Sequence, residues 1–400
     1  MYGHRVSRAY RAVVSAVNHP DTVNSTRGLF NKRSLAALAG EGVDLDVVVP
    51  RPHAPPVGPY SAYSEIPEVE DFGPYRGHHP RFWYLLPKRV FYGVTGRSFS
   101  RNVNEYVERQ FDDPDVAHGC HLYPDGYAMM AYAKAHGVPL TTVAHGTLLN
   151  TFENHLSSVQ RAIREVLRWS DRVLCVSHAL AGRAREIEPR TDAEHLPIGA
   201  TPSNFPTDSE AALRDEFDVP SDAVVVLFCG RFSAAKGVDD LLEVLRELTD
   251  ERLYFVFIGH GGDRREAIET GVTESRVRGR VLWQVDPVVV RRWFALADAF
   301  VLPSYSEGRP TVIYEAMASS TPVFASNVGG IPEQVADGET GALFDPGDTA
   351  ALRRLLDSVD VDELRTLGEN GLERLRSKGW TWEAHGERLS RVHRTLVADE

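Results

Sequence analysis

The feature that most constrains the fold of this chain is a regular alternation of short β-branched runs with helical patterns. Parallel strands need long crossover connections, usually helices, so such alternation is typical of doubly wound α/β sheets. Near the N-terminus, strands are predicted at Ala12–Val17 and Asp46–Val49, with a helix at Phe30–Gly40 between them. Val224–Cys229 is almost wholly apolar, as expected for a strand that helices cover on both faces. The sequence therefore predicts an α/β fold built on parallel sheets.

The alternation stops near Leu196–Asp208, where proline, glycine and asparagine cluster, and then restarts. We therefore expect two Rossmann-like domains, residues 1–198 and 199–378, that face a cleft. Pro50–Gly96 fits neither template and is interpreted as a long excursion from the first sheet. Further strands are predicted at Leu140–Ala144, Arg172–Val176, Tyr254–Ile258, Arg280–Leu282, Ala299–Leu302 and Pro322–Ala325, and helices at Asp125–His136, Thr151–Trp169, Val238–Leu248, Thr349–Leu356 and Val361–Lys378.

Composition excludes several classes of protein. The net charge of −12 argues against a general affinity for nucleic acid phosphates. No stretch approaches the roughly 20 apolar residues of a spanning helix, and Met1–Tyr10 lacks the apolar core of a secretory signal. We therefore expect a cytoplasmic protein. Cys120, Cys175 and Cys229 match no metal or redox spacing, so buried reduced thiols are predicted.

The segment GRFSAAKG, residues 230–237, directly follows an apolar strand and precedes a helix. Arg231 offers a planar fork to phosphate oxygens, and Lys236 adds a compact positive charge. A glycine at each end and the start of a helix complete a turn suited to a diphosphate. The alternative, equally open for this motif alone, is a surface turn with solvated cations. The later turn around Gly259 also follows a strand, but a plain tight turn explains it as well.

The most informative stretch, residues 300–348, contains Glu307 in a predicted loop and Glu315 in the helix predicted at Thr311–Ala318. Pro310 suits the first turn of that helix, where its missing N–H costs nothing. Amides at the helix start can meet a negatively charged phosphate, and carboxylates are natural acceptors for pairs of sugar hydroxyls. The alternative is that both glutamates simply face solvent.

This half of the chain resembles the retaining glycosyltransferase family 4, whose members have the GT-B fold. The resemblance rests on GRFSAAKG, FIGHG, LADAFVLPSYSEGRPTVIYEAMASSTPV and SNVGGIPEQVADGETG, in that order. It covers nearly the whole chain except residues 50–116. It also implies that a helix in residues 379–400, after Gly379-Trp380-Thr381-Trp382, crosses back to the first domain, with the two tryptophans as core anchors.

In the first domain, the resemblance rests on residues 25–30 (STRGLF), on His121 to Gly126 (HLYPDG), and on His145 after a strand. The resemblance implies that Arg231 and Lys236 neutralise the donor diphosphate, that Glu315 holds a ribose, and that Glu307 contacts the transferred sugar. The implied catalytic positions are His145, Arg231, Lys236 and Glu307, and the implied donor-binding positions are Gly28, Gly230, Gly259, Gly308, Arg309, Thr311, Val312 and Glu315.

The implied reaction is transfer of a sugar from a nucleotide sugar with retention of anomeric configuration, without a metal or other cofactor. Alternatives are a GT-B nucleotide-sugar epimerase and a non-catalytic nucleotide-sugar-binding subunit. Two departures from the family pattern stand out: Trp283-Gln284-Val285 replaces a common glycine near the base, and Ile198-Gly199-Ala200-Thr201 replaces the usual interdomain turn.

The acceptor is left open as lipid-linked, glycan or small-molecule. Arg76–Arg97 mixes cations with aromatic residues, which suits peripheral contact with the inner face of a membrane, although an ordinary packed excursion explains it too.

Overall fold

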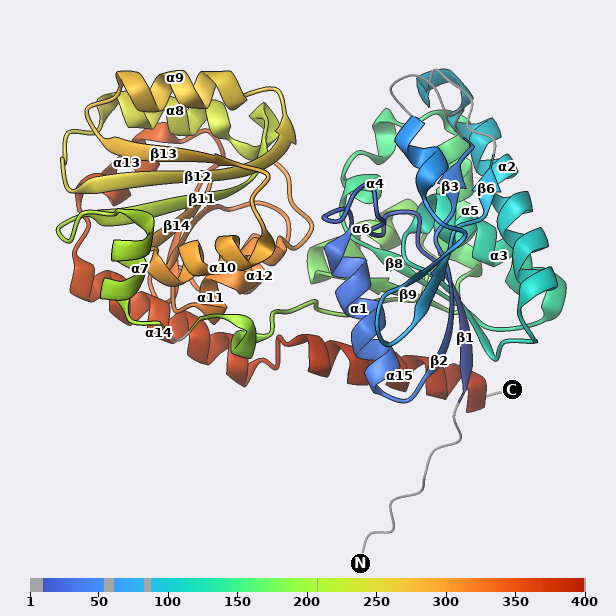
Figure 1. The fold of residues 1–400 in the computed structure, drawn as a ribbon. Coiled ribbons are helices and arrows are strands. Elements are labelled where there is room, and N and C mark those ends of the chain that lie inside the picture. Colours follow the sequence, from blue (N-terminus) through green and yellow to red (C-terminus); the bar gives the residue numbers. More distant parts are fainter. Residues whose placement is uncertain (1–9, 54–60, 83–87, 207, 399–400) are drawn as a thin grey trace, which may run out of the picture. The chain divides into compact units, whose positions relative to one another are not determined.

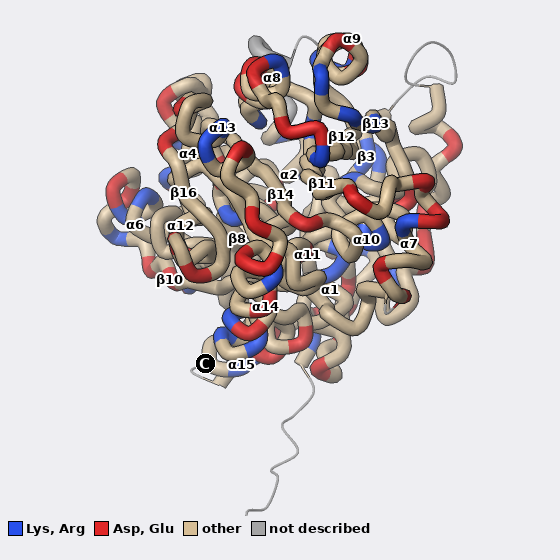
Figure 2. Tube along the Cα trace, turned by 90° about the vertical axis from the view of Figure 1, so that its left-hand side faces the viewer, with Lys and Arg blue, Asp and Glu red and all other residues tan. Residues whose placement is uncertain are grey.

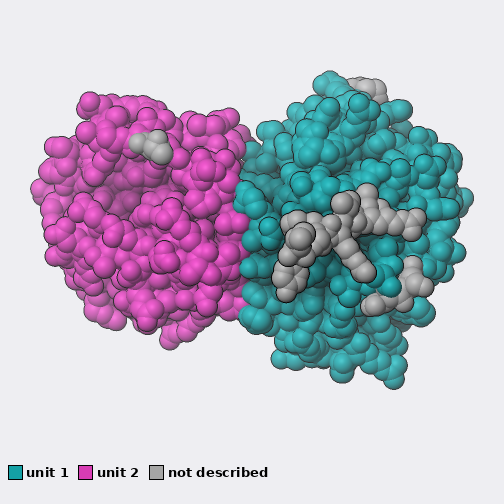
Figure 3. Space-filling view, turned by 90° about the horizontal axis from the view of Figure 1, so that it is seen from below, with its two compact units in different colours: residues 1–198, 382–400 teal, residues 199–381 magenta. Residues whose placement is uncertain are grey.

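The structure is a computed structural model that describes residues 10–53, 61–82, 88–206 and 208–398, with residues 88–95 described by their backbone alone. It divides into two compact units, coloured separately in Figure 3. Unit 1 comprises residues 1–198 and 382–400, and unit 2 comprises residues 199–381. No described helix combines the length and the apolar character needed to cross a bilayer.

Unit 1 is built on an eight-stranded sheet of order β10-β9-β8-β7-β1-β2-β5-β4, in which only β4 runs antiparallel to its neighbour (Figure 1). Because β2 lies on one side of β1 and β7 on the other, the strand order reverses between β1 and β7. The strands are β1 (Arg11–Ser15), β2 (Asp44–Val48), β4 (Val69–Asp71), β5 (Arg76–His78), β7 (Val116–Gly119), β8 (Leu140–Ala144), β9 (Arg172–Cys175) and β10 (Ala193–His195), with a separate pair β3 (Arg51–Pro52) and β6 (Arg81–Phe82).

Helices cover both faces of this sheet, with α1 and α15 packed together on one face and α2, α3 and α5 on the other (Figure 1). Gly386 of α15 lies so close to α1 that an added Cβ would be 2.5 Å from Ala37 O. The helices are α1 (Leu29–Gly40), α2 (Lys88–Gln110), α3 (Tyr127–His136), α4 (Thr147–Asn150), α5 (Ser157–Trp169), α6 (His178–Ile187) and α15 (Trp382–Ala398), with short turns η1 (Ser61–Glu65), η2 (Leu122–Gly126) and η3 (Phe152–Asn154).

Unit 2 has a fully parallel six-stranded sheet of order β13-β12-β11-β14-β15-β16, which is the doubly wound order 3-2-1-4-5-6. The order therefore reverses between β11 and β14. The strands are β11 (Val224–Phe232), β12 (Leu253–Gly262), β13 (Arg278–Trp283), β14 (Ala299–Leu302), β15 (Val323–Ser326) and β16 (Gly341–Phe344).

In unit 2, α8, α9 and α13 lie on one face of the sheet and α10 and α11 on the other (Figure 1). The inner side chains of β11 and β12 are buried with those of α8 in one apolar core, as the continuous apolar runs predict. The helices are α7 (Glu210–Phe217), α8 (Val238–Glu247), α9 (Arg265–Glu274), α10 (Pro287–Leu296), α11 (Thr311–Ala318), α12 (Ile331–Gln334), α13 (Thr349–Asp357) and α14 (Val361–Ser377), with turns η4 (Pro202–Asn204) and η5 (Ala234–Lys236).

The predicted α/β fold is correct, and three sequence-based expectations need adjustment. The segment Pro50–Gly96 is not merely an excursion, because its β5 and β4 extend the sheet beyond β2. The helix predicted at Thr151–Trp169 is broken, since Leu156 has an extended backbone (ψ 145°) and α5 starts only after it. Pro310 precedes α11 as its N-cap rather than lying in its first turn.

The predicted environments of the cysteines and tryptophans can be compared directly with the structure. The three cysteines are free thiols, two of them buried and Cys229 partly so. Trp380 and Trp382 are buried, as core anchors should be.

Acidic and basic residues alternate along the helices that Figure 2 displays, for example along α14. Of the stretch proposed for membrane contact, Arg76–Arg97, residues 83–87 lie outside the described residues.

Candidate active site

In unit 2, the predicted donor site lies at the carboxyl ends of β11 and β14, on either side of the point where the strand order reverses. Ligands of open α/β sheets bind at such a point, because the connections diverge there and leave the strand ends accessible. Lys236 follows β11 and Glu307 follows β14, and Lys236 Nζ donates to Glu307 Oε1 at 2.5 Å. The structure therefore joins two predicted catalytic residues that are 71 positions apart in the sequence.

Backbone contacts fix the two loops that carry this ion pair. Tyr305 N donates to Ala235 O at 3.0 Å, which ties the β14 loop to η5. Gly237 has a φ of +68°, and a Cβ there would lie 2.0 Å from Pro303 O. Similarly, a Cβ added to Gly329 would lie 2.0 Å from Glu307 O, so only glycine allows the two backbone segments to approach this closely. These glycines are required where backbone meets backbone.

Glu315 lies within electrostatic reach of the end of β11. Burial, and in addition the charge of Glu315, raise the pKa of the Cys229 thiol. Glu315 is partly exposed on α11, while Glu307 is nearly buried in the preceding loop. The predicted placement of one glutamate in a loop and the other in the following helix is therefore confirmed.

The β11 and β12 ends also gather positive charge. Arg231 is exposed, and burial together with the charges of Arg231 and Lys236 lowers the pKa of His260. His260 is thus mostly neutral at pH 7, beside two cations. Sequence analysis assigned no role to His260, although its position in FIGHG, just after the predicted strand Tyr254–Ile258, was a signal.

Arg309 was grouped with the donor-binding residues, and the structure gives its side chain other partners. Its guanidinium is 1% exposed, pairs with Glu333 at 2.8 Å, and also contacts the hydroxyl of Tyr314. The ring of Trp380 lies 4.9 Å from the guanidinium carbon. Its side chain therefore braces the loop from within unit 2, and any contact with a donor would involve the Arg309 backbone.

The first turn of α11, which holds Thr311 and Val312, is partly exposed after buried Gly308. The cap residue Pro310 provides no side-chain hydrogen bond to this helix start. Amides at such a helix start carry partial positive charge, which suits an anionic ligand.

The packing around β12 explains sterically why position 259 is a glycine. Gly259 pairs with Gly230 across β11 and β12, and a Cβ on Gly259 would lie 2.3 Å from the ring of Phe232. After β13, Gln284 takes a φ of +53° and donates its N–H to Gly259 O at 2.8 Å. This positive φ is one that glycine adopts most readily, and here a glutamine adopts it.

In unit 1, His145 follows β8 and lies at the carboxyl edge of the sheet. Its Nε2 lies 3.0 Å from Cys120 O, and Phe30 packs on its ring with centroids 4.6 Å apart. Burial, and next the neighbouring His121, lower the pKa of His145 well below its usual range. The ring is therefore neutral at pH 7, and because a carbonyl only accepts, the proton is on Nε2.

Gly28 sets the position of Phe30. It caps α1 with a φ of +61°, and a Cβ there would lie 2.0 Å from Asn18 O. The structure thus gives Gly28 a steric role at the start of α1, two residues before the ring that packs on His145. Its predicted contact with donor phosphates stays a prediction.

The point of strand reversal in unit 1, between β1 and β7, is organised by Asp125. This carboxylate is fully buried, and its Oδ1 accepts from Ser15 Oγ at 2.8 Å and from Val17 N at 2.9 Å. Its Oδ2 lies 3.4 Å from His121 Nδ1. Sequence analysis assigned neither residue a role, although both belong to the HLYPDG segment.

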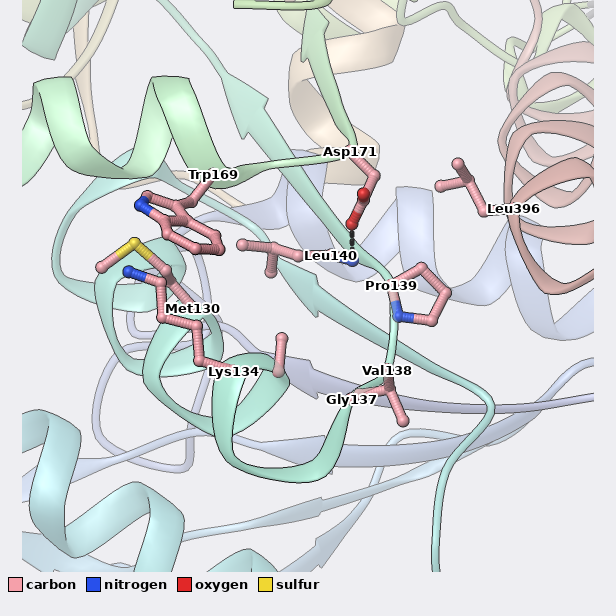
Figure 4. Close-up of a pocket in the computed structure, with 10 residues that line it drawn as sticks. Met130, Lys134, Gly137, Val138, Pro139, Leu140, Trp169, Asp171 and Leu396 are labelled. Carbon is pink, nitrogen blue, oxygen red and sulfur yellow. Dashed lines mark hydrogen bonds between the residues drawn. The ribbon is translucent and has the colours of Figure 1, made fainter. Parts of the chain in front are cut away.

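Two observations concern sites elsewhere. Within either unit taken alone, the described His, Cys, Asp and Glu side chains form no group of three that could share a metal ion. A hollow of about 670 Å³ beside Trp169, Lys134 and Leu140 lies at the amino edge of the unit 1 sheet (Figure 4). It includes none of the predicted site residues, which lie at the carboxyl edges.

The chain is similar in fold to sucrose-phosphate synthase from Thermosynechococcus elongatus, with a TM-score of 0.83 and 22% identity over 98% of this chain and 100% of that one. It is also similar to HepE from Anabaena in complex with UDP-glucose, with a TM-score of 0.71 and 16% identity over 96% and 99% of the two chains. These likenesses establish the GT-B fold.

Sequence comparisons agree with the fold. TuaC of Bacillus subtilis, assigned as a glycosyltransferase of teichuronic acid biosynthesis, is 28% identical over 78% of this chain and 80% of its own length. A D-inositol 3-phosphate glycosyltransferase of Streptomyces scabiei is 31% identical over 68% of this chain and 66% of its own length. Residues 32–200 match Glycosyltransferase Family 4, and residues 209–374 match Glycosyl transferases group 1. The chain therefore belongs to the family 4, group 1 glycosyltransferases.

Proposed function

We propose that this glycosyltransferase moves a sugar from a nucleotide diphosphate sugar to a lipid-linked, glycan or small-molecule acceptor, with retention of configuration and without a required metal. The observation that carries the proposal is the arrangement at the β11–β14 reversal point. There Lys236, Arg231, Glu307 and Glu315 gather beside the start of α11.

The donor diphosphate would bind between the cations after β11 and the amides that begin α11. In the structure Lys236 is paired with Glu307, so a bound diphosphate would take Lys236 as its partner and release Glu307 for a sugar hydroxyl. Glu315, near the end of β11, would accept from a ribose. HepE, which shares the fold, was solved with UDP-glucose, and this makes UDP-glucose the first donor to test.

During transfer, the bond between the anomeric carbon and the diphosphate oxygen breaks while the acceptor oxygen bonds to the same face of that carbon. The acceptor proton passes to the departing diphosphate oxygen. Positive charge aimed at that oxygen stabilises the transition state more than the ground state, because negative charge develops there. His145, neutral and held by Cys120 O, would position the transferred sugar.

The test is the change in melting temperature on adding UDP, UDP-glucose, GDP, GDP-mannose and ADP-glucose. We expect at least one to stabilise the wild type, because a ligand that binds only the folded state raises stability by mass action. That response should be lost in Lys236→Ala and Glu315→Ala, and it should survive EDTA if no metal is required.

Lys378→Ala, just after α14, and Glu369→Ala, in the middle of α14, are at exposed positions; they are matched controls and should keep the response. A response that survives in both Lys236→Ala and Glu315→Ala would place the ligand elsewhere and would contradict the proposed donor site. A product of inverted configuration, seen by NMR of the anomeric proton, would contradict retention.

A further inference from the structure

We propose that His121 and His145 act as a pair of hydrogen-bond acceptors that binds two hydroxyl groups of a sugar or polyol at the carboxyl edge of the unit 1 sheet. The two rings follow adjacent strands, β7 and β8, and their centroids are 4.9 Å apart. Of these two residues, only His145 was expected from the sequence to have a role.

The partners of the two rings favour opposite tautomers. Asp125 Oδ2 lies 3.4 Å from His121 Nδ1 without the geometry of a hydrogen bond, and because a carboxylate only accepts, its negative charge favours a proton on Nδ1. Cys120 O faces His145 at Nε2, so that ring carries its proton on Nε2. The remaining acceptors are Nε2 of His121 and Nδ1 of His145. Two acceptor nitrogens on rings whose centroids are 4.9 Å apart match ligands that bring two O–H donors.

The pair is held rigidly, as a binding site requires. Asp125 is anchored to the last residue of β1 through Ser15 Oγ and to the segment after it through Val17 N, so the carboxylate beside His121 cannot rotate freely. Phe30 borders both rings, with centroids 4.6 Å from His145 and 6.1 Å from His121. The His121 side chain keeps 17% of its surface exposed, so a ligand can reach it from solvent.

The tautomers are a property of the protein alone, whereas the class of ligand rests on the proposed function. The hydroxyl groups belong either to the transferred sugar of the donor or to the acceptor. These sources differ in one respect that can be measured, since a donor sugar arrives attached to a nucleotide.

The first experiment is nitrogen-15 NMR of the full chain with labelled histidine, with signals identified in His121→Asn and His145→Asn variants. We expect protonated Nδ1 in His121 and protonated Nε2 in His145 at pH 7.5. UDP, UDP-glucose, glucose and myo-inositol are then added separately. A shift of both signals with UDP-glucose but not UDP indicates the donor sugar, and a shift with glucose or myo-inositol indicates the acceptor.

Affinity for the responding probe is then compared in two substitutions that divide the functions of the ring. His121→Asn places an amide near Nδ1, keeping a donor for Asp125 but removing the Nε2 acceptor. His121→Gln places an amide oxygen near Nε2. We expect His121→Asn to lower the affinity for the probe by roughly 3- to 10-fold, which is the effect of one hydrogen bond. His121→Gln should lower the affinity less, because its amide oxygen replaces the lost acceptor.

If His121 had only a structural role, His121→Gln would lower the affinity more than His121→Asn, since only the asparagine keeps a donor near Asp125. That order, the opposite tautomer in either ring, or a failure of every probe to shift both signals would overturn the proposal. If the wild type bound no nucleotide, that result would instead count against the proposed function. The histidine pair would still be tested, because glucose and myo-inositol carry no nucleotide.

Discussion

At the scale of single residues, Arg309 shows how a residue beside the site can serve the fold. Its guanidinium is almost fully buried against Glu333, Tyr314 and Trp380. Breaking a buried ion pair costs up to about 3–5 kcal/mol, and losing the guanidinium also removes its contacts with Tyr314 and Trp380. We therefore expect Arg309→Met to lower the free energy of unfolding by about that much in chemical denaturation. The double variant Arg309→Met/Glu333→Gln should recover part of the loss, and two additive effects would contradict the pairing.

The residue scale also shows what the sequence could and could not predict. Glu307, Glu315, Arg231 and Lys236 were predicted because each lies in a local pattern of strand, glycine turn and helix. The Lys236–Glu307 pair was not, since it joins segments 71 residues apart through the sheet order. The same applies to Asp125, whose partners Ser15 and Val17 lie at the end of β1 and just after it, far away in the sequence.

At the scale of elements, the position of Lys236 depends on the turn η5 and on Gly237 after it. Gly237→Ala combines a left-handed backbone with a Cβ only 2.0 Å from Pro303 O, so the β11 and β14 loops must separate. We expect the variant to lose its melting response to the nucleotide that stabilises the wild type. Gly261→Ala is the matched control, because Gly261 has a similar φ of +61° with no atom near an added Cβ.

Gly261→Ala should lose only about 1–2 kcal/mol of stability from backbone strain and should keep the response to the nucleotide. Equal loss of the response in both variants would mean that backbone strain, and not the contact with Pro303, determines the position of Lys236.

The helices and strands themselves were largely predictable from the sequence, since strand and helix periodicities are local. The edge strands β4 and β5 were not, because they are short and lie in a segment rich in proline and glycine.

At the scale of the whole molecule, the buried histidines are unevenly divided between the units. Among the described residues, unit 1 contains eight histidines whose pKa is lowered chiefly by burial, whereas unit 2 contains one, His260. Among them, the pKa of His385 falls to about 4 and that of His118 to about 3. His385 joins α15 to α1 through Ser34, and His393 of α15 contacts Thr141 of β8. Burial of these rings thus accompanies the packing of α15.

The direction of the pH effect follows from these values. A lowered folded pKa means that the unfolded chain binds more protons below about pH 6.5, so stability is complete above that pH and falls as the pH drops toward 4. Each such histidine contributes about 1.4 kcal/mol per pH unit in this range. Asp46, whose pKa is raised to about 6 by burial, works in the opposite direction and offsets about one of them.

We therefore expect acid to unfold unit 1 before unit 2, which hydrogen exchange resolved by peptide would show between pH 7.5 and pH 5. Peptides from β1, β7 and α15 should lose protection, while those from β11 and β12 keep it. His385→Gln should reduce the pH dependence, because that position no longer takes up a proton on unfolding. His136→Gln, on α3, is the matched control for loss of a histidine outside the buried set. Equal loss of protection in both units would show that the burial of these histidines does not control acid stability.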